Sequence, residues 1–349
     1  MKDKVISPGT KRVLLIILSV VLSVVLIALI AGTAYMERML NLINKKPDES
    51  TMSREEYEQY LKDQAATQDP EATGETIDPN DVEMDLNDDP VESKSHILNI
   101  MLIGQDRRPG EGRTRSDVMI LCTFNKTTKE LTMTSFMRDL YVAIPGYQDD
   151  KMNASYFLGG MKLLDKCLET NFGVKVDGNL EVDFDGFKDV IDLMGGVDIY
   201  LSKSEANYMV SHGYSVINGT NRLYGEAALF YARNRSVGNS DFTRTERQRK
   251  VLTALFQKCK GMSLPQLQNL MEKVLPMITT DMTNREILSY LTDIVPMLGD
   301  MKVNTNRIPA DGTFTEPTIR GMSVLLPDLE ANRNILDDIM NRTTRPTED

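Results

Sequence analysis

The residues whose types and spacing could support chemistry lie in six short motifs between residues 104 and 248. Arginine presents a planar fork that binds phosphate through two parallel hydrogen bonds. Aspartates beside such arginines indicate a magnesium ion that is held together with the phosphates of a substrate. The motifs therefore predict an enzyme acting on a phosphorylated or pyrophosphorylated compound, and they comprise Gly104–Arg108, Arg115–Asp117, Met137–Asp139, Lys151–Asn153, Tyr231–Arg235 and Asp241–Gln248.

Asp106 and Asp117 are the candidate metal ligands. Asp106 follows one predicted strand and Asp117 opens the next, and open α/β sheets place their sites at such loop ends. Mg²⁺ usually takes one or two protein carboxylates and completes its shell with water and phosphate. The alternative is that both carboxylates lie on the surface and pair with Arg107 or Arg115. Spacing alone leaves both interpretations open.

Arg233 and Arg235 are candidate phosphate ligands, although residues two apart face different directions on a helix. They can converge on one ligand only if the helix ends there, and the loop-like residues 236–240 that follow favour such an end. Thr243 and Glu246 then fit a capping box for the next helix.

Arg244, Arg247 and Gln248 would lie on one face of that next helix, near its N-terminus, where anions bind favourably. The alternative is an exposed charged helix in which Glu246 pairs with a cation one turn later. Arg138, which follows a predicted strand, is either a phosphate ligand or the ion-pair partner of its neighbour in sequence.

Other common sites are disfavoured. The chain has no GxxxxGK(S/T) motif, which excludes a Walker-type nucleotide site, and no GxSxG motif. Its two histidines are scattered, and its three cysteines form no CxxC motif, which disfavours a catalytic triad, a zinc site and a disulfide framework. Asn153 precedes a predicted helix and is interpreted as its N-cap.

The acidity of the chain belongs to one segment. Residues 47–95 carry 16 acidic and 3 basic side chains, so the net charge of −11 leaves about +2 for the remainder. A domain that binds nucleic acid non-specifically is usually strongly basic, so no nucleic-acid partner is expected. The acidic segment has too few apolar residues for a core and is predicted to be a disordered tether, with one short helix from Ser53 to Lys62.

An uncharged run from Val13 to Met36 is long enough to span a bilayer. A signal-peptide core is usually shorter, so an uncleaved anchor is favoured. Basic residues before the run place the N-terminus in the cytoplasm and the bulk of the chain outside it. The expected organisation is a cytoplasmic tail (1–12), a transmembrane anchor (13–35), an acidic tether (36–95), a catalytic domain (96–260) and a C-terminal helical extension (261–349).

The elements that must position the motifs follow from periodicity. Strands are predicted at residues 97–103, 118–124, 131–136, 180–184 and 197–201. Helices are predicted at residues 154–171, 186–194, 224–232, 243–260, 264–277, 284–298 and 329–340. This mixture predicts an α/β fold with a central mixed sheet covered by helices on both faces.

The motifs and their order resemble the LytR-CpsA-Psr family of bacterial cell-wall enzymes. The matching features are an anchor, an acidic tether, a GxDxR-like loop, RSD before an apolar strand, RD after the third strand, KxNA, FxGF, GGV, YxRxR and DxxRxxRQ. They span about residues 96–260. One departure is Met137, because the family often has a proline before the arginine of the third-strand motif.

The resemblance implies a phosphotransferase that moves a glycopolymer, such as teichoic acid or capsule, from a polyprenyl-pyrophosphate carrier to peptidoglycan. It implies that Asp106 and Asp117 hold Mg²⁺ and that the prenyl tail lies in an apolar tunnel between the sheet and a helix layer. Arg107 or Arg108 matches the first arginine of the family. The other implied pyrophosphate ligands are Arg138, Arg233, Arg235, Arg244 and Gln248.

Three alternatives remain at this level. A hydrolase would use water in place of the peptidoglycan hydroxyl, and a non-catalytic module would bind the lipid carrier without metal dependence. A membrane-bound transcriptional attenuator would need a DNA-binding element in the cytoplasm, where only about twelve residues are expected. Which carboxylate acts as general base is left open.

Overall fold

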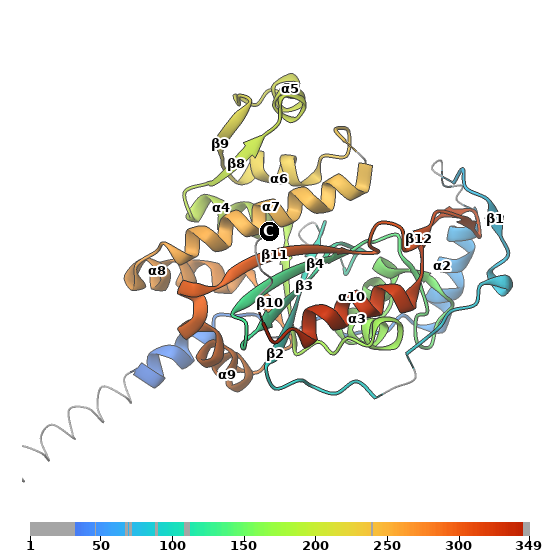
Figure 1. The fold of residues 1–349 in the computed structure, drawn as a ribbon, viewed down its shortest axis with the longest axis horizontal. Helices are drawn as coiled ribbons and strands as arrows, with labels where there is room; N and C mark the ends of the chain where they lie inside the picture. Colours follow the sequence, from blue (N-terminus) through green and yellow to red (C-terminus); the bar gives the residue numbers. More distant parts are fainter. Residues whose placement is uncertain are drawn as a thin grey trace, which may run out of the picture.

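The structure, a computed structural model, describes residues 32–344 except residues 46, 67–68, 70–71, 88–89, 108–111 and 239. A six-stranded sheet crosses the molecule (Figure 1). In spatial order its strands are β10 (Thr279–Thr280), β7 (Gly178–Asp183), β2 (Ile97–Gln105), β3 (Ser116–Asn125), β4 (Glu130–Phe136) and β11 (Lys302–Ile308). The sheet is mixed, because β2 is antiparallel to β3 but parallel to β7, and β4 is antiparallel to β3 but parallel to β11.

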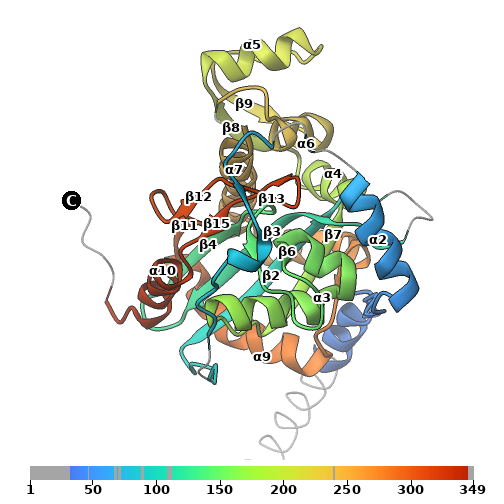
Figure 2. The same ribbon diagram turned by 90° about the vertical axis from the view of Figure 1, so that its right-hand side faces the viewer.

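Helices cover both faces of this sheet (Figures 1 and 2), which confirms the predicted α/β fold. One face, called here the packed face, is covered by α3 (Met152–Phe172) and α10 (Leu329–Asn341). The other, called the cavity face, is covered by α4 (Phe184–Leu193), α6 (Gly225–Arg233), α7 (Ser240–Lys260), α8 (Leu264–Val274) and α9 (Asn284–Ile294).

Alternation along the strands supplies both faces with apolar side chains, because successive residues of a strand point to opposite sides. In β2, Met101 and Ile103 join the core of the packed face, while Leu98 and Ile100 join the core of the cavity face. A continuous apolar run is therefore the expected signature of a strand that is covered on both sides.

An arm made of β8 (Val197–Leu201), α5 (Lys203–Ser211) and β9 (Gly219–Leu223) projects beyond α6 (Figure 2). The chain also has one further helix of 13 residues, α2 (Arg54–Ala66). The remaining elements are short: the 3-10 helices η1 (Pro79–Asp81), η2 (Leu275–Met277) and η3 (Val295–Asp300), and the strands β1 (Thr76–Ile77), β5 (Tyr141–Val142), β6 (Asp150–Lys151), β12 (Phe314–Thr315), β13 (Thr318–Ile319), β14 (Met322–Ser323) and β15 (Leu326–Pro327).

Two predicted helix starts are wrong. Helix α3 begins at Met152, so Asn153 lies inside its first turn and is not the N-cap. Helix α7 begins at Ser240, so Thr243 is a helical residue and not a cap. The added turn is stabilised by an ion pair between Asp241 and Arg244, three residues apart and 3.0 Å from each other.

The prediction that residues 47–95 form only a solvated tether is wrong for the parts that the structure describes. Residues 48–66, called here the N-terminal strap, lie against the packed face, where Tyr57 and Tyr60 pack on its core. The Tyr60 hydroxyl donates to Asp150 at 2.7 Å. The strap has no long apolar stretch, and for that reason its sequence suggested disorder. A few aromatic side chains are enough to hold it on the core, because each buries a large area.

The strap also completes a broken helix. Gly159 and Gly160 interrupt α3, and Gly160 has a φ of 69°, which a side chain would disfavour. A continuous helix would pair the Leu158 carbonyl with the Lys162 N–H. Here the Met52 N–H donates to the Leu158 carbonyl at 3.0 Å, and the Lys162 N–H donates to Glu49 at 3.2 Å.

The prediction that residues 261–349 form a separate helical extension is wrong. Strand β11 pairs along its whole length with β4, and β10 pairs with β7. Residues after 261 therefore supply both edges of the central sheet, and α10 packs against α3.

Most of the predicted anchor, residues 13–31, lies outside the described residues. Residues 32–40 are helical. Within the described part of the chain, no helix is long and apolar enough to cross a membrane.

Candidate active site

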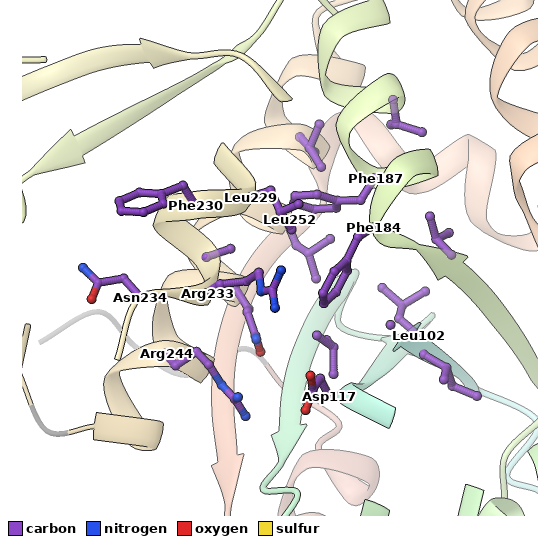
Figure 3. A pocket seen from close by; sticks show the side chains of 18 of the residues that line it. Leu102, Asp117, Phe184, Phe187, Leu229, Phe230, Arg233, Asn234, Arg244 and Leu252 are labelled. Carbon is purple, nitrogen blue, oxygen red and sulfur yellow. The ribbon is translucent and has the colours of Figure 1, made fainter. Parts of the chain in front are cut away.

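A cavity of about 790 Å³ lies between the sheet and the helices of the cavity face (Figure 3). Its floor comes from β2, β3 and β7, and its walls come from α4, α6 and α7. The lining is mostly apolar and includes Leu102, Val118, Leu180, Val182, Phe184, Phe187, Val190, Leu229, Phe230, Leu252, Leu255, Val274 and Ile278.

The polar lining gathers at one end of this cavity. Along α7 the lining residues are Arg244, Gln248, Leu252 and Leu255, which recur three or four residues apart and therefore share one helix face. The rise of about 1.5 Å per residue separates the first from the last by about 16 Å. The helix thus changes from a charged to an apolar wall along its own length.

Asp241 is the centre of the charged end. Its carboxylate lies 3.0 Å from Arg244, 3.4 Å from Arg235 and 3.8 Å from Arg138. Three guanidinium groups from three separate segments therefore converge on one point. The loop after α6 makes this possible, because α6 ends at Arg233 and the next residue, Asn234, is extended (φ −64°, ψ 124°), as predicted.

Two further ion pairs flank this cluster. Asp117 accepts from Arg138 at 3.2 Å, and Asp106 accepts from Arg233 at 3.0 Å. The Arg233 guanidinium also lies 4.6 Å from the centre of the Phe184 ring. Figure 3 shows Arg244 extending from α7 toward Asp117. Of the predicted residues, Asp117, Arg233, Arg235 and Arg244 line the cavity at this end, and Asp106 and Arg138 are their ion-pair partners.

Burial shapes the electrostatics of the cluster. Burial raises the pKa of Asp241 above its usual range, although the neighbouring arginines oppose this shift. Burial likewise lowers the pKa of Arg244 to about 10. Burial also lowers the pKa of Arg138, but Asp139, Asp241 and Asp117 outweigh this effect, so the pKa of that guanidinium is raised. Crowded cations in a partly dry site are poised to bind an anion.

Lys151 and Asp139 extend the network behind the mouth. Lys151 lies 2.9 Å from Asp139, which in turn lies 3.3 Å from Arg138. Burial raises the pKa of Asp139, but Lys151 and Arg138 outweigh it and lower that pKa. Asp139 is therefore an anion that orients Arg138, which confirms the ion-pair interpretation, and phosphate binding by Arg138 stays a prediction.

Not every predicted ligand reaches the cavity. Arg107 pairs at 3.6 Å with the buried Glu181 on the packed face and does not line the cavity. Arg108 lies outside the described residues. Arg247 is 2% exposed and bonds Glu205 at 2.9 Å and the carbonyls of Asn234 and Val237. It fixes the loop that carries Arg235 and does not face a ligand.

Sequence reasoning missed the role of Asp241, although it opens the motif that holds Arg244. The available signal was its position three residues before an arginine in a first helical turn, which is a common pairing distance. It also missed Phe184, whose ring lies against Arg233. Nothing in the order of the sequence indicates that Phe184 and Arg233 lie against each other.

Asp106 and Asp117 are of the residue type that binds magnesium, and each lies beside an arginine of the site. Among the described residues, no group of three or more His, Cys, Asp or Glu side chains could hold a metal. Magnesium at a phosphate site needs only one or two carboxylates, because phosphate oxygens and water complete its shell. Asp106 and Asp117 are hard oxygen donors whose side chains are 48% and 28% exposed beside the arginines.

Comparisons with known proteins agree with this geometry. The model of the LytR_cpsA_psr family matches residues 55–339. The regulatory protein MsrR of Staphylococcus aureus (strain Mu50) is 37% identical over 177 residues, which are 50% of this chain and 53% of MsrR. The polyisoprenyl-teichoic acid–peptidoglycan teichoic acid transferase TagT of Bacillus subtilis is 36% identical over 174 residues, which are 48% of this chain and 54% of TagT. The chain thus spans about half the length of the curated relatives it matches.

Solved structures share the fold. The crystal structure of B. subtilis TagT superposes with a TM-score of 0.57 and 25% identity, covering 73% of this chain and 96% of TagT. A structure of the LytR-CPS2A-psr family protein YwtF (TagT) with bound octaprenyl pyrophosphate lipid has a TM-score of 0.55 and 23% identity, covering 75% and 100% of the two chains.

Proposed function

Because the chain belongs to the LytR_cpsA_psr family, we propose that it is a phosphotransferase that moves an anionic or capsular glycopolymer from a polyprenyl-pyrophosphate carrier to peptidoglycan. The observation that carries the proposal is the division of the cavity into a mouth with three converging arginines and an apolar interior. A polyprenyl pyrophosphate is divided in the same way, into a charged pyrophosphate group and an apolar hydrocarbon chain. In support, TagT is a teichoic acid transferase and YwtF holds octaprenyl pyrophosphate.

In the proposed reaction, a peptidoglycan hydroxyl attacks the phosphorus atom that carries the glycopolymer. A new oxygen–phosphorus bond forms, the bridging bond between the two phosphates breaks, and polyprenyl phosphate leaves. The proton of the hydroxyl passes to a carboxylate near the mouth, which acts as the general base. Arg138, Arg235 and Arg244 hold the phosphates and neutralise their charge, which is most of what phosphoryl transfer requires.

We also propose that Asp106 and Asp117 hold a magnesium ion when substrate is bound. Such an ion supplies positive charge to the phosphate oxygens as the leaving phosphate gains negative charge. Arg138 and Arg233 would then share these carboxylates with the ion, since each already bonds one of them.

The uncharged run from Val13 to Met36 is proposed to anchor the chain in the cell membrane, with the domain outside the cytoplasm. The domain could then reach both the lipid carrier and the peptidoglycan acceptor from the outer surface of the membrane. The anchor has the length and flanking charge that such a segment needs.

The test is product analysis with purified full-length chain in detergent. Lipid-linked glycopolymer is supplied with and without peptidoglycan fragments, and the polymer-bearing product and released polyprenyl phosphate are quantified. Transfer predicts release that depends on peptidoglycan. Equal release without it identifies a hydrolase. Binding without release in the presence of Mg²⁺ identifies a non-catalytic carrier-binding module.

A further inference from the structure

The apolar end of the cavity adjoins the first described helix of the chain. Ile278 lines the cavity and also packs in a cluster with Met39, Leu40 and Ile43. These three side chains are 2%, 1% and 8% exposed, so residues 32–44 are docked on the domain. Leu275 of η2 completes the cluster, and it directly follows Val274, another residue that lines the cavity.

Polar bonds fix this docked segment at the edge of the sheet. The Asn44 N–H donates to the Ile278 carbonyl at 3.0 Å, and the Thr280 N–H donates to the Asn44 carbonyl at 2.9 Å. The Asn44 amide also donates to the Thr279 hydroxyl at 3.0 Å. Asn44 therefore forms a single parallel bridge to Thr279 of β10, which ties the docked segment to the edge of the sheet beside the cavity wall.

The docked segment is continuous with the uncharged run of the sequence. That run ends at Met36, inside the helix formed by residues 32–40. Met39, three residues later, is already buried against the domain. No flexible linker therefore separates the proposed anchor from the apolar end of the cavity.

The charged end lies away from this corner. Ile278 directly precedes β10, and β7 and β2 separate β10 from β3, the strand that carries Asp117. At about 4.8 Å per strand this is a sideways separation of about 14 Å. Figure 1 shows α8 and α9 beside the helix at the start of the described chain, with the arm beyond α6 at the opposite side. The cavity is thus oriented with its apolar end toward the anchor and its arginines away from it.

We propose that residues 35–43 and 271–278 form a lipid portal, through which the prenyl chain passes directly from the bilayer into the cavity. The occupant is the hydrocarbon chain of the pyrophosphate carrier. The docked helix holds the domain close to the membrane with the apolar end facing the lipid, so the chain need not cross water. This inference rests on the proposed function and deepens it by assigning the route of the substrate.

The test is to separate the anchor from the docked helix without touching a buried side chain. A flexible insert of about 20 Gly/Ser residues between Thr33 and Ala34 lifts the domain from the membrane by a few nanometres at most. The same insert between Thr343 and Thr344 is the matched control. Both chains are reconstituted in phosphatidylcholine/phosphatidylglycerol vesicles that carry a long-chain polyprenyl-pyrophosphate-linked glycopolymer, and transfer to peptidoglycan fragments is measured.

The portal predicts that the N-terminal insert lowers transfer from the vesicle by tenfold or more, and that the C-terminal insert does not. Binding of water-soluble farnesyl pyrophosphate should be equal in both variants and in the parent, because this short ligand needs no portal. Full transfer by the N-terminal insert would overturn the portal while leaving the proposed function intact. A parent chain that fails to bind farnesyl pyrophosphate would instead overturn the proposed function, and the portal with it.

A second measurement reports the orientation directly. A fluorophore on Gln268→Cys in α8 is compared with one on Asn207→Cys in the arm, both exposed positions, with Cys259 replaced by serine. Nitroxide lipids in the vesicle should quench the first label strongly and the second weakly. Equal quenching of the two labels, or stronger quenching in the arm, would contradict the proposed orientation.

Discussion

The two faces of one sheet have opposite characters. The packed face is closed by α3, α10 and the N-terminal strap, and its polar side chains bond each other, as Gln105, Tyr156 and Glu181 do at 2.6–3.0 Å. The cavity face leaves about 790 Å³ between the same strands and the helices α4, α6 and α7. The strands supply apolar side chains to both faces alike.

The difference lies in how each helix layer is held. On the packed face, α3 is tied to the sheet and to the strap, and Arg113 bonds the carbonyls of both Ser50 and Phe157. On the cavity face, the helices are joined near the mouth by ion pairs around Asp241 and by the buried pair of Arg247 and Glu205. The charged groups of the cavity face are thus concentrated at the mouth, and they are the groups proposed to bind an anion.

The largest effect should come from the carboxylates of the cavity mouth. Asp106→Ala and Asp117→Ala should each lower transfer by about a hundredfold or more, because the leaving phosphate would lack the charge that a divalent ion supplies. EDTA should do the same to the parent, and added Mg²⁺ should restore it. If EDTA-treated enzyme transfers at the full rate, these aspartates only orient Arg233 and Arg138.

The next effect concerns the packed face. A fragment of residues 96–349 should unfold more easily than one of residues 47–349, because it loses Tyr57 and Tyr60 from the core and two backbone partners of α3. Burial of one such side chain contributes roughly 1.5–3 kcal/mol. We expect the free energy of unfolding, measured by urea titration, to fall by about 3 kcal/mol or more. Equal midpoints and slopes would show that the strap is dispensable.

A tenfold effect is expected from the geometry of the arginines. Arg233→Lys and Arg235→Lys should each weaken binding of farnesyl pyrophosphate by about tenfold or more, since lysine keeps the charge but not the bidentate contact, and a charge-assisted bond contributes roughly 1.5–3 kcal/mol. Arg222→Lys is the matched control, because Arg222 pairs with Asp198 on the exposed side of the arm. Calorimetric titration that finds equal affinity in all three variants would remove both arginines from the site.

The smallest effect is a pH dependence of the packed face. Asp165 of α3 bonds the Asn179 amide at 2.9 Å, and burial raises its pKa to about 8, with Asp281, Glu49 and Glu169 adding to the shift. The folded state therefore binds a proton that the Asp165 carboxyl of the unfolded chain releases near the ordinary aspartate pKa of 3.8. Its contribution to stability is present at low pH and is lost as pH rises toward 8.

Asp165→Asn should accordingly flatten the loss of stability between pH 5 and pH 8.5, and leave binding of farnesyl pyrophosphate unchanged. The measurement is the urea midpoint of parent and variant at both pH values. Parallel pH profiles for the two proteins would show that Asp165 does not carry the proton.

The sequence by itself determined the strands, most of the helices and the identity of the chemistry. Local periodicity was sufficient for β2, β3 and β4, because burial on both faces leaves an unbroken apolar run. The loop character after Arg233 was sufficient to predict that the helix ends there, which is the condition for Arg233 and Arg235 to face the same cavity. The motifs and their order also indicated the family, whose model matches residues 55–339.

Only the tertiary structure decided which elements meet. Residues 302–308 read as an extended segment, but their place at the edge of the sheet depends on pairing with β4, more than 160 residues earlier. The same holds for β10 and for the strap, whose few aromatic side chains pack on a core built from distant parts of the chain. Periodicity reports that a side chain is buried and does not report its partner.

The direction of each arginine was likewise beyond the sequence. Arg244 and Arg247 belong to one motif, yet the first faces the cavity and the second is buried against Glu205. A guanidinium is directed by the carboxylate or carbonyl that satisfies its donors, and those partners come from distant parts of the chain. The sequence therefore determined which residues could hold a pyrophosphate, and the packing of α5, α6 and α7 decided which of them do face the cavity.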